Sequence, residues 1–165
     1  TETGCPKFYR SRYLDTWPSA DIDQVRLSLY TGGESVVDMV FNGTGSTRED
    51  WFSASRLLSA PWDDLQGTNP VRFSLMGEHC RRFYISTTAG FAGPDCFQMY
   101  GWLIVLGKPG NACPIDKEAQ YEHPTLYTTH YIAPQFLYAN GSNQTNFGDQ
   151  EYGKADVMAI FIKLK

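Results

Sequence analysis

Two short segments joined by a pair of glycines place the strongest constraint on the fold of this sequence. Val25–Tyr30 alternates between apolar and polar residues, as a strand with one buried face does. Val36–Phe41 is rich in the β-branched residues that favour strands. The connection Thr31–Glu34 contains Gly32 and Gly33, and glycine reaches the positive φ that tight hairpin turns need. The sequence therefore predicts a β-hairpin over these residues.

Further short apolar segments recur along the chain and are separated by turns rich in Gly, Pro and Asn. They are Lys7–Leu14, residues 71–75, Arg82–Ser86, Tyr100–Leu106, Gln135–Ala139 and Val157–Lys163. Tyr100–Leu106 is apolar almost throughout, which is typical of a strand buried on both faces. About eight short strands with such turns predict an all-β fold, an antiparallel β-sandwich or jelly roll.

One helical segment is expected within this all-β fold, from Arg48 to Leu58. Thr47 and Asp50 have the spacing of a capping box, with Asp in place of the usual Glu or Gln. Pro61 would end the helix. The fold class is therefore predominantly β with at most one short helix.

The composition indicates a single globular domain. The chain has 165 residues, of which 15% are aromatic and only 19% are charged, and this excludes disorder. Its net charge of −4 gives no electrostatic basis for binding nucleic acid. No apolar run approaches the roughly 18 residues of a membrane span. Residues 1–4 look like the remnant of a secretory expression vector, and residues 5–165 are expected to form one secreted β-sandwich domain.

Four cysteines favour an oxidising compartment. Cys5, Cys80, Cys96 and Cys113 form no C-x-x-C pair, so zinc-ribbon and thioredoxin-like sites lack their spacing. Two disulfides are expected, and the sequence leaves three connectivities open. The pairing Cys96–Cys113 is favoured because one apolar strand lies between the two residues, and Cys5–Cys80 then follows.

Three N-x-S/T sequons also indicate secretion. They begin at Asn42, Asn140 and Asn143, and two of them share one polar turn. We expect a secreted, extracellular glycoprotein with glycans on these asparagines.

The residues that could carry chemistry follow no catalytic or metal-binding motif. His123 and His130 lie in an irregular Pro-rich region, and together with Arg82 they are the candidates if the chain is an enzyme. Acidic pairs such as Asp63 and Asp64 lack the spacing of a calcium loop, so surface acidity is favoured and calcium is the weaker alternative. No other cofactor or metal is expected.

Aromatic side chains are the best candidates for ligand binding, since Tyr and Trp can stack on sugar rings and still offer a polar tip. The candidates are Tyr121, Tyr127, Tyr131, Tyr138 and Trp62. Trp102, Phe161 and Phe73 are expected in the core instead.

Several apolar stretches resemble segments of small secreted invertebrate domains of the mollusc type. These are Trp51-Phe52-Ser53 with Arg56-Leu57-Leu58-Ser59, Gly101–Val105 and Ala155–Phe161. The resemblance implies secretion and a β-rich fold, and it implies no activity and no site residues.

Three functions are compatible with the sequence. The leading hypothesis is a lectin-like secreted binding module for a glycan or another small extracellular ligand. The alternative is a cofactor-independent secreted enzyme, of the oxygenase, luciferase or esterase type, with an aromatic pocket for a small apolar substrate. The third is a structural or adhesive protein whose copies join through a flat apolar interface as a homo-oligomer.

Overall fold

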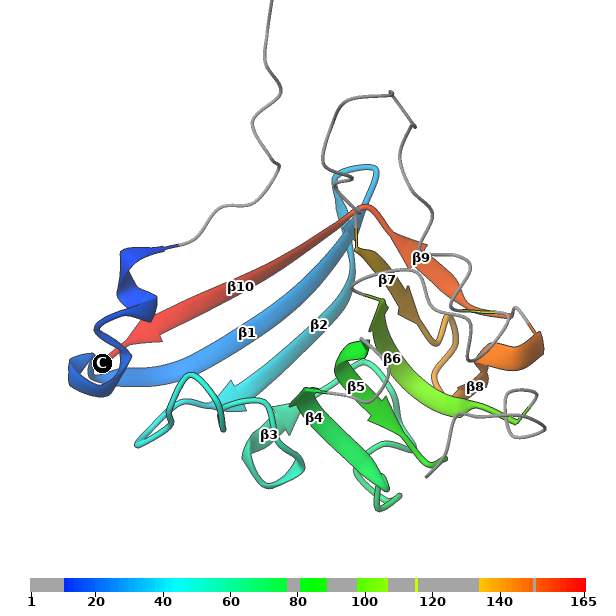
Figure 1. Ribbon diagram of the computed structural model, residues 1–165, viewed down its shortest axis with the longest axis horizontal. Coiled ribbons are helices and arrows are strands. Elements are labelled where there is room, and N and C mark those ends of the chain that lie inside the picture. The colour runs from blue at the N-terminus through cyan, green and yellow to red at the C-terminus, as the bar shows by residue number, and fades with distance from the viewer. Residues whose placement is uncertain (1–10, 77–80, 89–97, 107–114, 116–133, 150) are drawn as a thin grey trace, which may run out of the picture.

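Two antiparallel sheets make up the fold (Figure 1). The computed structural model describes residues 11–76, 81–88, 98–106, 115, 134–149 and 151–165. Within these ranges the helical structure is limited to short 3-10 turns. The predicted antiparallel all-β class is therefore confirmed.

The first sheet contains the predicted hairpin. Its strands follow the order β10-β1-β2-β3. Their bounds are β1 (Ile22–Thr31), β2 (Glu34–Asn42), β3 (Leu57–Ser59) and β10 (Val157–Leu164). Thr31 pairs with Glu34, and between them Gly32 and Gly33 have φ values of 59° and 90°. Positive φ at both central residues matches the twist of the flanking strands, so the double glycine fixes this turn.

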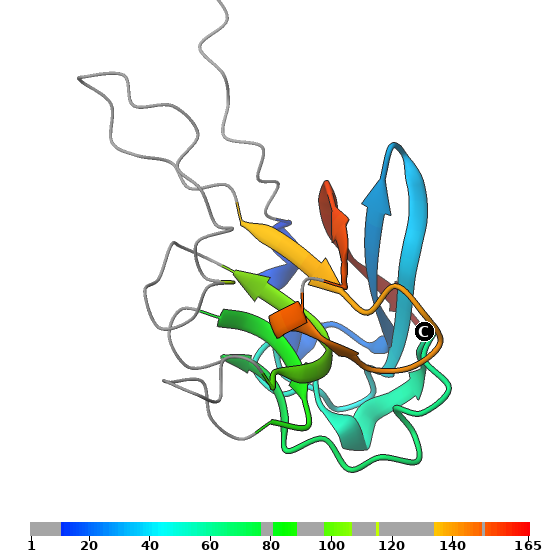
Figure 2. The ribbon, with the colours of Figure 1, turned by 90° about the vertical axis from the view of Figure 1, so that its right-hand side faces the viewer.

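The second sheet follows the order β4-β5-β6-β7-β9, with the short strand β8 paired to β6. Its bounds are β4 (Arg72–Met76), β5 (Arg81–Ser86), β6 (Tyr100–Leu106), β7 (Gln135–Tyr138), β8 (Thr145–Asn146) and β9 (Gly153–Ala155). A view from the side shows the two sheets as separate layers (Figure 2). The chain passes from the second sheet to the first at Asp156, whose backbone N–H donates to the Tyr30 carbonyl.

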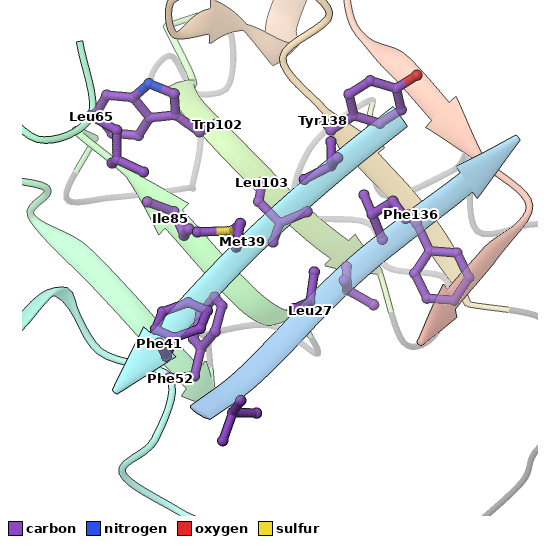
Figure 3. Packing of buried hydrophobic residues seen from close by; sticks show 14 of the residues in the cluster. Leu27, Met39, Phe41, Phe52, Leu65, Ile85, Trp102, Leu103, Phe136 and Tyr138 are labelled. Atoms are coloured by element: carbon purple, nitrogen blue, oxygen red, sulfur yellow. The ribbon is translucent and has the colours of Figure 1, made fainter. Parts of the chain in front are cut away.

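The main core lies between the sheets. Leu27 and Met39 project from β1 and β2 toward Ile85 and Leu103 of β5 and β6, and all four side chains are completely buried (Figure 3). This seam removes one face of each sheet from water, which is the main stabilising contribution in such a fold.

Strand β6 is buried on both faces, as its continuous apolar sequence predicts. Leu103 and Val105 belong to the core between the sheets. Ile104 and Leu106 belong to a second apolar cluster, together with Phe147 of the 3-10 turn η6 (Phe147–Asp149). The second sheet is therefore covered on two sides.

The predicted helix over 48–58 is wrong. The capping interactions do form, since Thr47 Oγ1 accepts from the Asp50 N–H and Asp50 Oδ1 accepts from the Thr47 N–H. The chain then leaves the helical path because the consecutive residues Trp51 and Phe52 are both buried. Only the 3-10 turn η3 (Ala54–Arg56) follows, and it leads into β3.

The predicted strand over Lys7–Leu14 is also wrong in its described part. Residues 12–14 form the 3-10 turn η1 (Arg12–Leu14), and Ser11 caps it through its side chain. A second turn, η2 (Trp17–Ser19), follows before β1 begins. The other predicted strands are confirmed, and the short strands β3, β8 and β9 were not predicted.

The pairing of β5 with β6 generates a test at Gly101. A Cβ atom there would lie 2.5 Å from the Ile85 carbonyl oxygen and 3.0 Å from Ser86 Cα, so the backbone would have to move. We expect Gly101→Ala to lower the free energy of unfolding by about 1–3 kcal/mol in chemical denaturation. Gly141→Ala is the control, because nothing lies within 4 Å of its added Cβ. Equal midpoints for the two variants would contradict the close approach.

Candidate functional site

Many of the predicted site residues lie outside the described residues. These are the catalytic candidates His123 and His130, the ligand-binding candidates Tyr121, Tyr127 and Tyr131, and all four cysteines, Cys5, Cys80, Cys96 and Cys113. Their roles, including the pairing Cys96–Cys113, stay predictions. Arg82 lies in β5 and is exposed.

The two described ligand-binding candidates, Trp62 and Tyr138, lie in the core between the sheets. Trp62 is only 2% exposed, and its Nε1–H donates to the Ala139 carbonyl at 2.9 Å. Tyr138 is 7% exposed and lies against Gly153, where an added Cβ atom would overlap its ring. Neither ring offers a free face for stacking on a sugar.

Asp64 connects three parts of the chain next to Trp62. Its Oδ1 accepts from Trp102 Nε1 at 2.7 Å, and its Oδ2 accepts from the Gln144 N–H at 2.9 Å. The neighbouring Asp63 N–H donates to the Ser142 carbonyl. These bonds join the β3–β4 connection, β6 and the β7–β8 connection, which is a structural role.

The acidic residues form no metal site in the part of the chain that the structure describes, where no three His, Cys, Asp or Glu side chains gather. A hydrogen bond from Arg48 lowers the pKa of the Glu49 carboxyl, and both of these neighbouring side chains are exposed. No helix among the described residues is long and apolar enough to cross a membrane.

All three sequon asparagines, Asn42, Asn140 and Asn143, are exposed. Asn42 lies at the end of β2, where its Oδ1 accepts from the Thr44 N–H at 3.0 Å. The Arg56 guanidinium donates to the Thr44 carbonyl and so holds this loop. The Asn42 side-chain oxygen is thus engaged in the turn while the residue faces solvent.

Exposed apolar side chains gather on β10. Of the eight large hydrophobic side chains that are exposed in the described ranges, four belong to this strand: Val157, Ile160, Phe161 and Leu164. Phe161 is 42% exposed, so its prediction as a core residue is wrong. Because these side chains belong to one element, β10 is the candidate site among the described residues.

The position of β10 explains this exposure. It pairs with β1 on one side, and no described residue pairs with its other edge (red strand, Figure 1). With eight residues it is the longest edge strand, against five in β4 and three each in β3 and β9. Edge strands are usually protected by charges, proline or bulges. In β10 the charge is Lys163, whose Nζ lies 2.6 Å from Asp23 Oδ2.

The outer face beside β10 carries an ordered set of polar contacts. The Arg26 guanidinium lies 4.7 Å from the centroid of the Phe161 ring and 4.0 Å from Asp38. Ser28 and Ser35 both donate hydrogen bonds to the Asp38 carboxylate. These contacts hold Arg26 over one face of the Phe161 ring. The apolar residues of β10 therefore lie next to polar side chains, an arrangement that is common in protein–protein contact surfaces.

The fold and this edge define an all-β, two-sheet protein with an apolar edge strand, β10, whose second side has no partner among the described residues. Comparison with protein-family models, curated proteins and solved structures gives no match. The comparisons therefore add no family to the resemblance of its apolar segments to secreted invertebrate domains. The sequence predicts β10 as a strand but does not single it out as a candidate site. The feature that could have done so is its long apolar run, in which Lys163 is the one charged residue.

The bonds of Asp64 generate a prediction about stability. In Asp64→Asn only one oxygen remains, so either the Trp102 N–H or the Gln144 N–H faces an amide NH₂ group. Leaving such a donor unsatisfied costs about 1–3 kcal/mol, and the free energy of unfolding in denaturant should fall by that amount. Asp63→Asn, at an exposed neighbour, should change it by less than about 0.5 kcal/mol. An equal loss in both variants would contradict the role of Asp64.

Proposed function

We propose that this chain is a secreted glycoprotein module that binds an extracellular polypeptide through the free edge of β10. The observation that carries the proposal is the gathering of Val157, Ile160, Phe161 and Leu164 on one edge strand. An open edge offers backbone N–H and C=O groups to an incoming strand, and its alternate side chains provide selectivity. This is the mode of β-strand addition.

A polypeptide suits this edge better than a glycan does. Most described aromatic side chains are packed in the core, where Phe41, Trp51 and Phe52 contact one another. Apart from Phe161 on β10, the exposed aromatic residues among those described are Tyr13 and Tyr100, which lie on different elements, η1 and β6. The catalytic alternative rests on Arg82, which is exposed on β5, and on His123 and His130, which lie outside the described residues.

Secretion is part of the proposal and rests on the sequons and the even number of cysteines. The exposure of Asn42, Asn140 and Asn143 supports glycosylation, since the transferring enzyme must reach the asparagine side chain.

Ligand class can be tested with two probes. We expect a phage-displayed library of random linear decapeptides to yield binders with apolar residues at every second position, because alternate side chains meet one face. Phe161→Ala should lower the affinity for a selected peptide by about tenfold, which corresponds to about 1.4 kcal/mol of binding free energy. Tyr100→Ala, at an exposed ring on the other sheet, should leave affinity unchanged. The proposal would be overturned if no peptide were selected and the protein instead bound a glycan on an array, with that binding lost in Tyr100→Ala.

Glycosylation at Asn42 can be tested without disturbing its turn. In protein secreted from eukaryotic cells, we expect Thr44→Ala to remove the mass of one N-glycan, because the sequon needs the hydroxyl group. The backbone N–H that Asn42 accepts from is kept in this variant. Thr44→Ser keeps the hydroxyl group and should retain the glycan in intact-mass spectrometry. A mass difference between the two variants that equals only the extra oxygen atom of Ser over Ala, with no glycan difference, would show that Asn42 is not modified.

A further inference from the structure

The backbone direction of β10 follows from the hairpin turn. In a two-residue hairpin the closing pair, Thr31 and Glu34, exchanges backbone hydrogen bonds, so the polar groups of Thr31 point toward β2. Because this direction alternates along a strand, the groups of Tyr30, Ser28 and Arg26 point toward β10. Their register partners in β10 are Val157, Ala159 and Phe161. The odd-numbered residues of β10 therefore bond to β1.

The even-numbered residues of β10 consequently direct their N–H and C=O groups toward the free edge. These residues are Met158, Ile160, Ile162 and Leu164. Any strand that adds to this edge must present matching groups at every second position.

A second copy of β10 meets this requirement. In an antiparallel pair about a two-fold axis at Phe161, Met158 lies opposite Leu164 of the second copy, and Ile160 lies opposite Ile162. All four outward-directed residues then have partners. An axis at Ile160 would instead place Leu164 opposite position 156, beyond the end of the strand.

The side chains also match in this register. Phe161 lies opposite itself as a non-hydrogen-bonded pair, the arrangement in which side chains are closest and aromatic pairs are favourable. Lys163 lies opposite Ala159, so no charge meets a like charge across the pair. Arg26, which covers Phe161, is balanced by Asp38 in the same protomer.

We propose that the polypeptide bound at β10 is the β10 strand of a second copy of this chain, in antiparallel register about Phe161. This inference rests on the proposed function and specifies its partner. The contact joins two four-stranded sheets into one continuous sheet with two-fold symmetry, and it places the exposed side chains of the two β10 strands next to one another on each face of that sheet.

Sedimentation velocity over a range of concentrations tests the dimer and its register. We expect a monomer–dimer equilibrium whose dissociation constant rises at least about tenfold in Phe161→Glu, because two carboxylates then face each other at the axis. In Phe161→Gln the new side chain has nearly the same size as Glu but no charge, so the dissociation constant should rise clearly less than in Phe161→Glu. Val157→Glu is the matched charge control, since in this register it lies opposite Lys165 of the second copy. Thermal unfolding of each variant confirms that the monomer is folded.

Backbone amide exchange measured by NMR provides an independent readout. On dimerisation, protection should increase at Met158, Ile160, Ile162 and Leu164 and stay unchanged at the alternate residues of β10. Sedimentation as a monomer at every concentration, or an equal effect of Val157→Glu and Phe161→Glu, would overturn the second copy as the partner. If the protein is monomeric and selected peptides still depend on Phe161, the binding function stands and the partner is another polypeptide. If neither occurs, both proposals fail.

Discussion

The burial of β6 on both faces is the constraint on which the rest of the structure depends. Leu103 and Ile104 point to opposite sides of the second sheet, and each is buried in a different apolar cluster. The second sheet therefore requires a layer on each side, and the first sheet supplies one of them. In the described structure the first sheet has only one covered face. Its central strands accordingly direct polar side chains such as Arg26 and Asp38 outward, and its edge strand becomes the place where apolar surface stays exposed.

Many of the aromatic side chains pack against one another in the core between the sheets. Phe52 contacts Phe41, Phe73 and Phe83 with ring centroids 4.9 to 5.4 Å apart, in tilted or edge-to-face geometry that favours aromatic pairs. Phe83 has a φ of 44°, a left-handed conformation that costs a non-glycine residue about 1–3 kcal/mol. It lies where the β5–β6 register shifts, and the packing of its ring against Trp51 and Phe52 offsets that strain. The high aromatic content of this sequence therefore indicates mainly a packed core, and it does not by itself indicate a ligand-binding site.

Much of the fold could be predicted because its signals are local. The Gly32-Gly33 turn and the alternation of β1 depend on neighbouring residues alone, and both are confirmed. The prediction of a helix after Thr47 relied on the capping residues, and these do form their hydrogen bonds. The chain nevertheless does not continue as a helix, because Trp51 and Phe52 are buried through tertiary contacts that the local sequence does not reveal. The candidate site was not predictable for a similar reason. The Trp62 side chain is amphipathic, and only the tertiary structure shows that it is a core residue, with 2% exposure and a bond to the Ala139 carbonyl.

The two most apolar strands, β6 and β10, show why sequence alone could not locate the candidate interaction edge. Both carry apolar residues on both faces, a pattern that is stable only when both faces are covered. β6 has neighbours on each side and a layer over each face, whereas β10 has β1 on one side and four of its six large apolar side chains exposed to water. Burying such a side chain fully is worth about 1.5–3 kcal/mol, so the exposed groups of β10 represent stabilisation that the described residues do not supply. In the part of the chain that the structure describes, a strand with the composition of a central strand thus stands at the edge of a sheet, and its open side presents backbone groups to which another strand can pair.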